Sequence, residues 1–436
     1  MDRITAPFVA ADEEVEERDH RFNAYRFAAS DNAKAIVSEV IRLLLNYEAH
    51  FGLRKNTRRA ADQETFDLTV AAILSDLMYH HLTERGGDVY TTRSNRLLAT
   101  KSRYRPAAYN KMFPYILDLM ENPEMGFVVQ DVPPPLRGQS RSTVIRPGVS
   151  LLSRIEEHDI GLDDFGEQPH GETIILKRTK DEGDYWDEGG LKEYFDTAVT
   201  AQFRRELAEI NQWLASADLR FSRTGIPWPH TAFHIDDRQL RRIFTQDRFD
   251  SGGRLFGGFW QRLRKHERRQ GLWISGEKAL ELDYGQVGPR ILYGLAGQKP
   301  PAEDLYQLWG YVQQRDGIKR VMNAMIFASE RLARFPRETR KLFRSSDKIG
   351  EVVKAIEAKH PLIKDQFHRG LGHEAQFVES QIMVEIILTL KAGGIMALPI
   401  HDAVLIPASQ LTIATDIMLS IFEKYTGVQG TVSVEG

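Results

Sequence analysis

Apolar residues recur along the chain at two spacings, one typical of helices and one typical of short strands. Four segments carry apolar positions at the 3.6-residue period of an amphipathic helix, and shorter apolar runs end at Gly, Pro or polar residues, as strands do. The predicted helices cover residues 30–50, 65–83, 107–120 and 191–215, and the predicted strands cover residues 126–130, 143–146, 173–177, 279–284 and both halves of 396–407. This mixture predicts an α+β fold.

Short polar residues before apolar segments predict where two helices begin. Ser30 or Asp31 stands before the first apolar stripe and is suited to capping a helix N-terminus. Asp236 and Asp237 stand before the apolar positions of residues 240–244. We expect this acidic pair to cap a short helix there rather than to bind a metal ion.

Composition places the chain among soluble globular proteins. Its 436 residues are enough for two or three domains, and it is 42% hydrophobic and 27% charged. The absence of cysteine excludes disulfides and thiolate metal sites. No apolar run has membrane-spanning length, and the N-terminus lacks the features of a signal peptide. We therefore expect a cytoplasmic protein with no membrane partner.

Charge is distributed unevenly, although the net charge is only −3. Residues 241–270 hold nine Lys and Arg against three Asp and Glu. Near the N-terminus, two helices with a basic turn precede two predicted strands, and the loop between these strands carries Arg137 and Arg141. This order resembles a winged helix, which would place basic side chains on DNA phosphates. The alternative is a solvated basic face on a packing module.

The segment from Ala279 to Arg290 has the strongest chemical pattern. Its apolar run carries Glu281 and Asp283, which share one face of a strand, and glycines then end the run before a predicted helix. A carboxylate at the end of a buried strand is suited to holding a metal ion. Asp283 alone also fits the cap of the next helix.

Two later segments carry complementary chemistry. Arg315, Lys319 and Asn323 are spaced by four residues and form one stripe on a predicted helix, where two cations suit a triphosphate. The alternative is a solvated basic face. His401-Asp402 interrupts two apolar half-strands, as a charged group at the tip of a hairpin does.

These three segments, in this order, resemble motifs A, B and C of family A DNA polymerases and the related single-subunit, phage-type RNA polymerases. The resemblance spans about residues 250–425 and implies a right-hand polymerase palm and fingers. It implies two Mg²⁺ ions, for which Mn²⁺ can substitute, held by Asp283, Asp402 and the backbone carbonyl of Tyr284. It also implies that Lys319 is catalytic and that His401 contacts the primer terminus. The residues implied to bind the nucleotide are Arg315, Lys319, Asn323, Phe327 and Gly288.

Two further matches concern the nucleic acid. Residues 377–381 resemble the phage-type stretch that ends in Ser-Gln, in which the glutamine, here Gln381, contacts the nascent pair or the primer end. Gly253-Arg254-Leu255 resembles the Gly-Arg-Leu of DNA polymerases, in which the arginine reaches the minor groove. Around it, the basic side chains predicted to hold phosphates are Arg262, Arg264 and Lys265.

Departures from the family pattern bear on the choice of sugar. DNA polymerases have a glutamate where this chain has Gly288, and both groups have a tyrosine where it has Phe327. Ala403 replaces the second carboxylate of the DNA polymerase motif C. We therefore expect weak discrimination between ribonucleotides and deoxynucleotides.

The sequence therefore predicts three regions and one enzymatic function. Residues 1–150 are expected to form a mainly helical, winged-helix-like nucleic-acid-binding domain, residues 151–245 a linker and thumb-like region, and residues 246–436 the palm with compact fingers. The expected function is two-metal synthesis of a DNA or RNA strand from nucleoside triphosphates, as a primase or gap-filling polymerase. The alternatives are a template-independent terminal transferase and a non-catalytic DNA-binding replication initiator or regulator with a palm-like scaffold.

Overall fold

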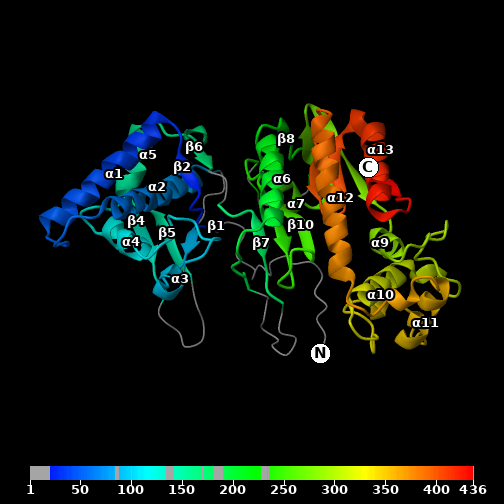
Figure 1. Ribbon diagram of the computed structural model, residues 1–436. Coiled ribbons are helices and arrows are strands. Elements are labelled where there is room, and N and C mark those ends of the chain that lie inside the picture. Colours follow the sequence, from blue (N-terminus) through cyan, green and yellow to red (C-terminus); the bar gives the residue numbers. More distant parts are fainter. Residues whose placement is uncertain are drawn as a thin grey trace. The chain divides into compact units, whose positions relative to one another are not determined.

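The computed structural model divides the chain into two compact units that each mix helices and sheets (Figure 1). It describes residues 20–83, 88–99, 101–133, 142–167, 171–179, 190–226, 233 and 235–435. The N-terminal unit ends at Glu172 and the C-terminal unit begins at Thr173. The sequence predicts domain boundaries at residues 150 and 245. The boundary between the two units falls instead inside the predicted linker.

The N-terminal unit packs its helices around a four-stranded sheet of order β1-β3-β5-β4. Its strands are β1 (His20–Arg21), β2 (Arg26–Ala28), β3 (Val89–Thr91), β4 (Val128–Asp131), β5 (Thr143–Pro147) and β6 (Phe165–Glu167). Its helices are α1 (Asp31–His50), α2 (Ala60–Leu82), α3 (Asn95–Ala99), α4 (Phe113–Glu121) and α5 (Val149–Glu157). β2 and β6 form a separate antiparallel pair.

The predicted N-terminal helices are present, with boundaries set by caps and buried pairs. The Ser30 side chain accepts a hydrogen bond from the Ala33 backbone, which confirms the predicted cap of α1. α2 begins at Ala60, earlier than predicted, directly after a loop fastened by Arg58. The Arg58 guanidinium is buried against the Glu48 carboxylate of α1 and lies 3.9 Å from the Phe66 ring centre.

The two strands predicted for the wing form the antiparallel pair β4–β5. They are part of a larger sheet, because β3 pairs with the other edge of β5 and β1 extends it further. The predicted tip of the wing, with Arg137 and Arg141, lies outside the described residues. The winged helix stays a prediction, and its two-stranded wing is here one side of a four-stranded sheet.

The C-terminal unit contains a six-stranded and a three-stranded sheet. Its strands are β7 (Ile174–Leu176), β8 (Leu219–Phe221), β9 (Leu240–Phe244), β10 (Gly252–Gly257), β11 (Leu272–Ile274), β12 (Glu277–Tyr284), β13 (Leu398–Ile400), β14 (Ala403–Pro407) and β15 (Val432–Glu435). Its helices are α6 (Ala198–Ala215), α7 (Phe259–Arg262), α8 (Lys265–Gly271), α9 (Val287–Leu295), α10 (Arg315–Phe327), α11 (Ile349–Lys359), α12 (Gly372–Ala392) and α13 (Leu411–Thr426). The long helix α12 packs against β10, α6, α9 and α13 (Figure 1).

Residues predicted as linker instead complete the sheets and core of the C-terminal unit. α6 begins at Ala198, later than predicted, because the side chain of Thr197 caps its first turn. Its apolar face packs against β7 and β9, so residues 173–245 do not form a region of their own.

The predicted helix at residues 240–244 is wrong, because this segment is strand β9. Its side chains alternate between buried and more exposed positions, and the inward position between Leu240 and Phe244 is Arg242. Arg242 is fully buried and donates hydrogen bonds to the Gly253 carbonyl and the Ser380 hydroxyl. Because one buried position of this strand is an arginine, its apolar residues alone do not show the two-residue period of a strand.

β12 runs through the middle of its sheet, paired with β14 on one edge and β15 on the other. Its last six residues, from Ala279 to Tyr284, are those of the predicted strand. β13 and β14 form the predicted hairpin with His401 and Asp402 as its two-residue turn. Among the helices of the described ranges, none has the length and apolar character needed to cross a membrane.

Candidate active site

Two carboxylates predicted as metal ligands come from neighbouring strands. Asp283 lies near the end of β12, opposite Ala403 of β14, and Asp402 directly precedes Ala403 in the hairpin turn. The Tyr284 backbone N–H donates to the Asp402 carbonyl at 3.3 Å. His401 has a φ of 53°, a left-handed conformation that suits the first position of a tight hairpin turn. The turn therefore presents Asp402 beside Asp283.

Both carboxylates line one pocket with residues of all three predicted segments. The predicted site residues that line it are Arg254, Asp283, Tyr284, Gly288, Lys319, Asn323, Phe327 and Asp402. Additional lining residues come from the turn after β12, the loop before α10 and the first half of α12; they include Gln286, Tyr306, Gln376 and Glu379. Segments about a hundred residues apart in sequence thus form one site.

The electrostatics of the pocket disfavour two bare negative charges. Burial, and after it the neighbouring charge of Asp402, raises the pKa of Asp283 to about 6 against the opposing charge of Lys319. Among the described residues, neither aspartate forms an ion pair within 4 Å. A group whose folded-state pKa is raised favours the folded protein when protonated, so ionised Asp283 costs stability at neutral pH. A bound cation would offset this repulsion.

Two other carboxylates near the site are each neutralised by an arginine. Glu281, on the same face of β12 as Asp283, accepts hydrogen bonds from Arg268 at 3.0 and 3.1 Å. Glu379 of α12 accepts from Arg254 of β10 at 2.6 and 2.8 Å. The structure thereby separates two paired, structural carboxylates from two that face the pocket without a partner.

The donor set of the pocket suits a hard divalent cation. Asp283 and Asp402 offer carboxylate oxygens, which Mg²⁺ prefers, and Mg²⁺ is commonly held by one or two carboxylates and substrate phosphates. The described residues contain no cluster of three or more His, Asp or Glu side chains arranged to hold a metal ion. The predicted ligands Asp283, Tyr284 and Asp402 all line the pocket.

α10 has the predicted boundaries and presents its polar stripe to the site. Ile318 and Met322 are buried in the core, whereas Lys319 and Asn323 on another face of the helix line the pocket. Arg315, one turn before Lys319, does not line the pocket. Its side chain forms an ion pair with Asp304.

The two positions expected to select the sugar both line the pocket. A Cβ atom added to Gly288 would lie 3.6 Å from the Ile326 Cδ1 atom, which is ordinary contact, so the pocket has room for a side chain there. Phe327 packs edge-on against the His373 ring at 5.2 Å. A Cβ atom on Gly372 would come within 2.3 Å of the Phe327 ring, so glycine is required for this packing.

The residues predicted to contact nucleic acid are dispersed. Arg254 lines the pocket, and His401 lies half-buried against the Phe256 ring at 5.4 Å. Burial and the charge of Arg254 lower the pKa of His401. The Gln381 amide oxygen accepts a hydrogen bond from Arg242, beside rather than within the pocket lining.

The three residues of the basic block also lie outside the pocket lining. Arg262 pairs with Asp237 at 3.0 Å. Arg264 caps α8 through its backbone, which bonds the Glu267 carboxylate. The charge of Lys265 lowers the pKa of Asp283, although less than burial and Asp402 raise it.

Several pocket residues were missed by the sequence analysis. Glu379 lies inside the stretch compared with the Ser-Gln motif, but its sequence gives no sign of the distant Arg254 that it binds. Tyr306 and Asp304 lie in a loop without periodicity. Their only signal was the closeness of this loop to the basic stripe of α10.

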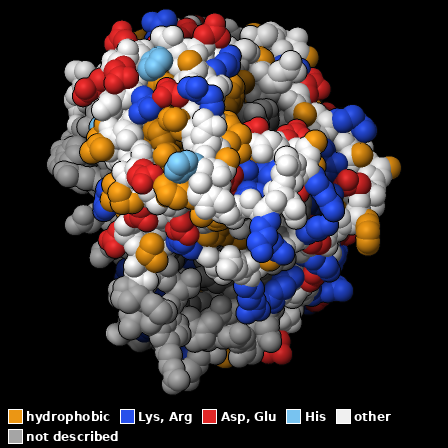
Figure 2. Space-filling view, turned by 90° about the vertical axis from the view of Figure 1, so that its left-hand side faces the viewer, with side chains coloured by type: hydrophobic (Ala, Val, Ile, Leu, Met, Phe, Trp, Pro, Cys, Tyr) orange, Lys and Arg blue, Asp and Glu red, His pale blue; other side chains and the backbone are white. Residues whose placement is uncertain are grey.

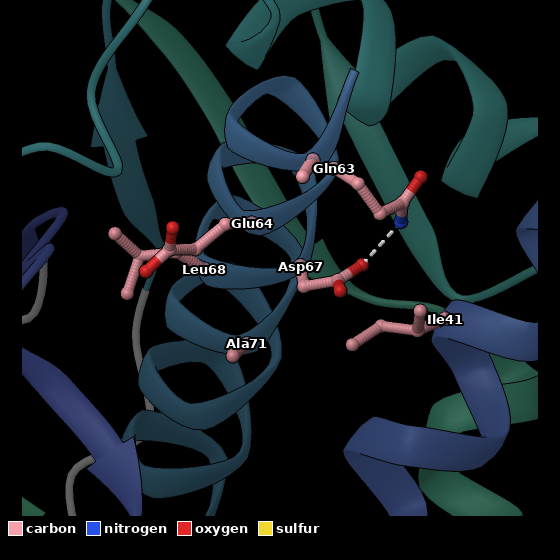
Figure 3. Close-up of a pocket in the computed structure, with 7 residues that line it drawn as sticks. Ile41, Gln63, Glu64, Asp67, Leu68 and Ala71 are labelled. Atoms are coloured by element: carbon pink, nitrogen blue, oxygen red, sulfur yellow. Dashed lines mark hydrogen bonds between the residues drawn. The ribbon is translucent and has the colours of Figure 1, made fainter. Parts of the chain in front are cut away.

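A second, open pocket lies in the N-terminal unit between α1 and α2 (Figure 3). Ile41 of α1 faces Asp67 and Ala71 of α2, and the Gln63 amide donates to the Asp67 carboxylate at 2.6 Å. None of the predicted site residues lines this pocket.

We predict that Glu281→Ala and Asp283→Asn change stability in opposite directions. Glu281→Ala leaves the buried Arg268 cation without its partner and should lower the free energy of unfolding by about 3–5 kcal/mol. Asp283→Asn removes a repelled charge and should leave that free energy unchanged or raise it. Urea denaturation of both variants measures the difference. Equal destabilisation would contradict the distinction between paired and unpaired carboxylates.

Comparisons with known proteins give matches among solved structures, and the similarity to the one described here is weak. No family model matches the chain, and no curated protein matches it. Among solved structures, the chain is similar to the POL domain of Pol1 from M. smegmatis in complex with DNA primer-template and dNTP, with 12% sequence identity and a TM-score of 0.30. The match covers 54% of this chain and 50% of that chain, so about half of each protein is compared. The assignment of a function therefore rests on the geometry of the pocket.

Proposed function

We propose that the chain is a nucleotidyltransferase that synthesises a nucleic-acid strand from nucleoside triphosphates. The observation that carries this proposal is the pair Asp283 and Asp402, adjacent and without ion-pair partners among the described residues, in one pocket with Lys319. Two neighbouring carboxylates suit divalent cations, and a lysine on a rigid helix suits a phosphate. Phosphoryl transfer depends on this combination of positioning and charge.

Each pocket residue has a distinct role in this proposal. Magnesium ions held by Asp283 and Asp402 would supply activation of a strand hydroxyl and neutralisation of the leaving pyrophosphate. Lys319 contacts phosphate oxygens and offsets their charge. Asn323, one turn further along α10, and Phe327 border the nucleoside part of the pocket.

The distribution of charge supports a nucleic-acid partner despite the net negative charge. Figure 2 shows Lys and Arg side chains gathered on one side of the face that it presents, while acidic and apolar side chains mix elsewhere. In the N-terminal unit, the exposed cations of the predicted basic region include Arg96, Lys101 and Lys111. Clustered cations that neutralise phosphates give sequence-independent affinity.

The lining of the pocket favours a polymerase that accepts ribonucleotides. Gly288 has no side chain to contact a 2′-hydroxyl, and Phe327 lacks the hydroxyl of the tyrosine found in the resembled families. We infer that the chain uses NTPs, alone or with dNTPs, in a priming or gap-filling role. Template-independent extension is the alternative within the same chemistry.

A non-catalytic scaffold is the alternative from another class. A scaffold would gain stability by neutralising Asp283, as Arg268 neutralises Glu281 in the same strand. The pocket instead keeps two carboxylates whose repulsion costs stability, which is characteristic of sites that bind a charged ligand. This contrast favours the enzyme.

We predict that Asp283→Ala and Asp402→Ala each abolish strand synthesis. Each removes a metal ligand, so the rate should fall at least about a thousandfold because metal-supplied charge stabilisation is lost. The measurement is extension by purified protein given primer-template, single strand alone or no primer, with NTPs or dNTPs. Duplex binding, measured by fluorescence anisotropy, should remain.

Asp416→Ala is the matched control, because Asp416 is an exposed carboxylate of α13 outside the pocket. This variant should retain wild-type extension. If the wild type and Asp283→Ala behave alike in every format, the proposal of catalysis is wrong. Extension that needs no template would select the terminal transferase.

We also predict that Gly288→Glu shifts the preference toward dNTPs. A carboxylate here would occupy the space beside Ile326 and exclude a 2′-hydroxyl, so the ratio of NTP to dNTP use should fall at least about tenfold. Gly288→Ala is the control, since a methyl group makes only ordinary contact and should change little. Steady-state incorporation of single nucleotides gives both ratios. Unchanged ratios in Gly288→Glu would place the sugar elsewhere.

A further inference from the structure

The loop between α9 and α10 precedes the helix that carries Arg315 and Lys319, and α9 itself follows the turn after β12. Leu305 and Leu308 are buried and anchor this loop in the core. Asp304 directly precedes the first of these anchors. Its side chain contacts Gln286, just before α9, and Arg315, at the start of α10. Its side chain is therefore positioned by the fold rather than by the loop alone.

The Asp304 carboxylate accepts three hydrogen bonds. The Gln286 side-chain amide donates to Oδ1 at 3.2 Å, and the Tyr306 backbone N–H donates to the same oxygen at 2.9 Å. The other oxygen, Oδ2, accepts from the Arg315 Nε group. Partial burial opposes ionisation of Asp304, but the hydrogen bonds from Arg315 and the Tyr306 backbone lower its pKa. The carboxylate is thus held in its charged form.

Gln286 connects Asp304 to the turn after β12. It lies three residues after Asp283 and has a left-handed backbone with a φ of 59°, which is uncommon for a residue other than glycine. Its amide oxygen accepts from the Leu305 backbone at 3.3 Å while its amide nitrogen donates to Asp304. The same side chain lines the pocket.

Arg315 is held at one edge and exposed at the other. Asp304 binds only its Nε group, and the Tyr306 ring centre lies 5.5 Å from its guanidinium carbon. The side chain remains 45% exposed, and its terminal nitrogens make no hydrogen bond with the described residues. These two nitrogens can therefore bind another oxyanion while Asp304 stays bound.

We propose that Gln286 and Asp304 are positioning residues that hold Arg315 ready for the polyphosphate of a nucleotide. This proposal rests on the proposed function and deepens it, because it names how one phosphate ligand is oriented. Arg315 lies one turn before Lys319, so a polyphosphate extending from the pocket along α10 reaches both cations. Fixing a long side chain in advance removes an entropic cost from binding.

A merely electrostatic role for Asp304 predicts the opposite sign. Asp304 is an anion near the proposed polyphosphate, so its removal would strengthen anion binding if repulsion were its only effect. A positioning role predicts weaker binding when Asp304 is lost, but only while Arg315 is present. The two roles are therefore separated by a double-mutant cycle.

The test is calorimetric binding of inorganic tripolyphosphate to the full chain in magnesium-free buffer. Asp304→Ala should weaken the affinity about five- to tenfold in the wild-type background, the effect expected for releasing one ordered side chain and its hydrogen bonds. In the Arg315→Ala background, Asp304→Ala should leave the affinity unchanged or strengthen it. Gln286→Ala should weaken it in the same background-dependent way.

The matched control is Glu303→Ala, which removes the neighbouring carboxylate of the same loop. Glu303 lies 4.0 Å from Lys359 and does not contact Arg315. Its loss should not weaken tripolyphosphate binding. Asp304→Asn keeps the shape of the side chain and should weaken the affinity less than Asp304→Ala. Each variant should unfold at the same temperature as the wild type.

Three outcomes would overturn the positioning role. They are wild-type protein without affinity for tripolyphosphate, Asp304→Ala that binds as tightly as wild type, and equal weakening in the presence and absence of Arg315. Strand synthesis is measured separately on the wild type. Protein that shows the expected cycle but extends no strand would contradict the proposed function and leave the positioning of Arg315 established.

Discussion

Repulsion between Asp283 and Asp402 is the constraint on which the site depends. The two carboxylates are brought together by backbone pairing of β12 with β14, which is part of the sheet itself and cannot relax without breaking strands. Burial raises the pKa of Asp283, and the charge of Asp402 raises it further. The fold therefore supplies the stability that this pair costs, and a bound cation would recover it.

Two carboxylates near this pair are each bound by an arginine. Arg268 binds Glu281 behind the pocket, and Arg254 binds Glu379 at its edge. The paired strands β9 and β10 carry Arg242 and Arg254, and these side chains hydrogen-bond two successive residues of α12. These arginines bind partners within the protein. Arg254 can therefore contact a nucleic acid only through the guanidinium N–H groups that do not bind Glu379.

The proposed nucleotide side of the pocket is connected to the proposed metal side through polar contacts as well as through the core. Gln286 follows directly after the β12 turn, and its amide reaches the loop that orients Arg315. α10 buries its apolar face against the core of the same unit. A shift of the turn would therefore move both the carboxylates and the proposed phosphate ligands, which keeps the two halves of the site in register.

Sequence alone determined the elements whose signals are local. The C-terminal end of β12, the span of α10 and the His401-Asp402 turn follow from periodicity and from glycine, proline and polar breaks, which act over a few residues. Tertiary structure decided which charges are neutralised, since Glu379 and Arg254 are 125 positions apart and no local pattern links them. It also made residues 240–244 a strand, because the burial of Arg242 depends on partners in β10 and α12.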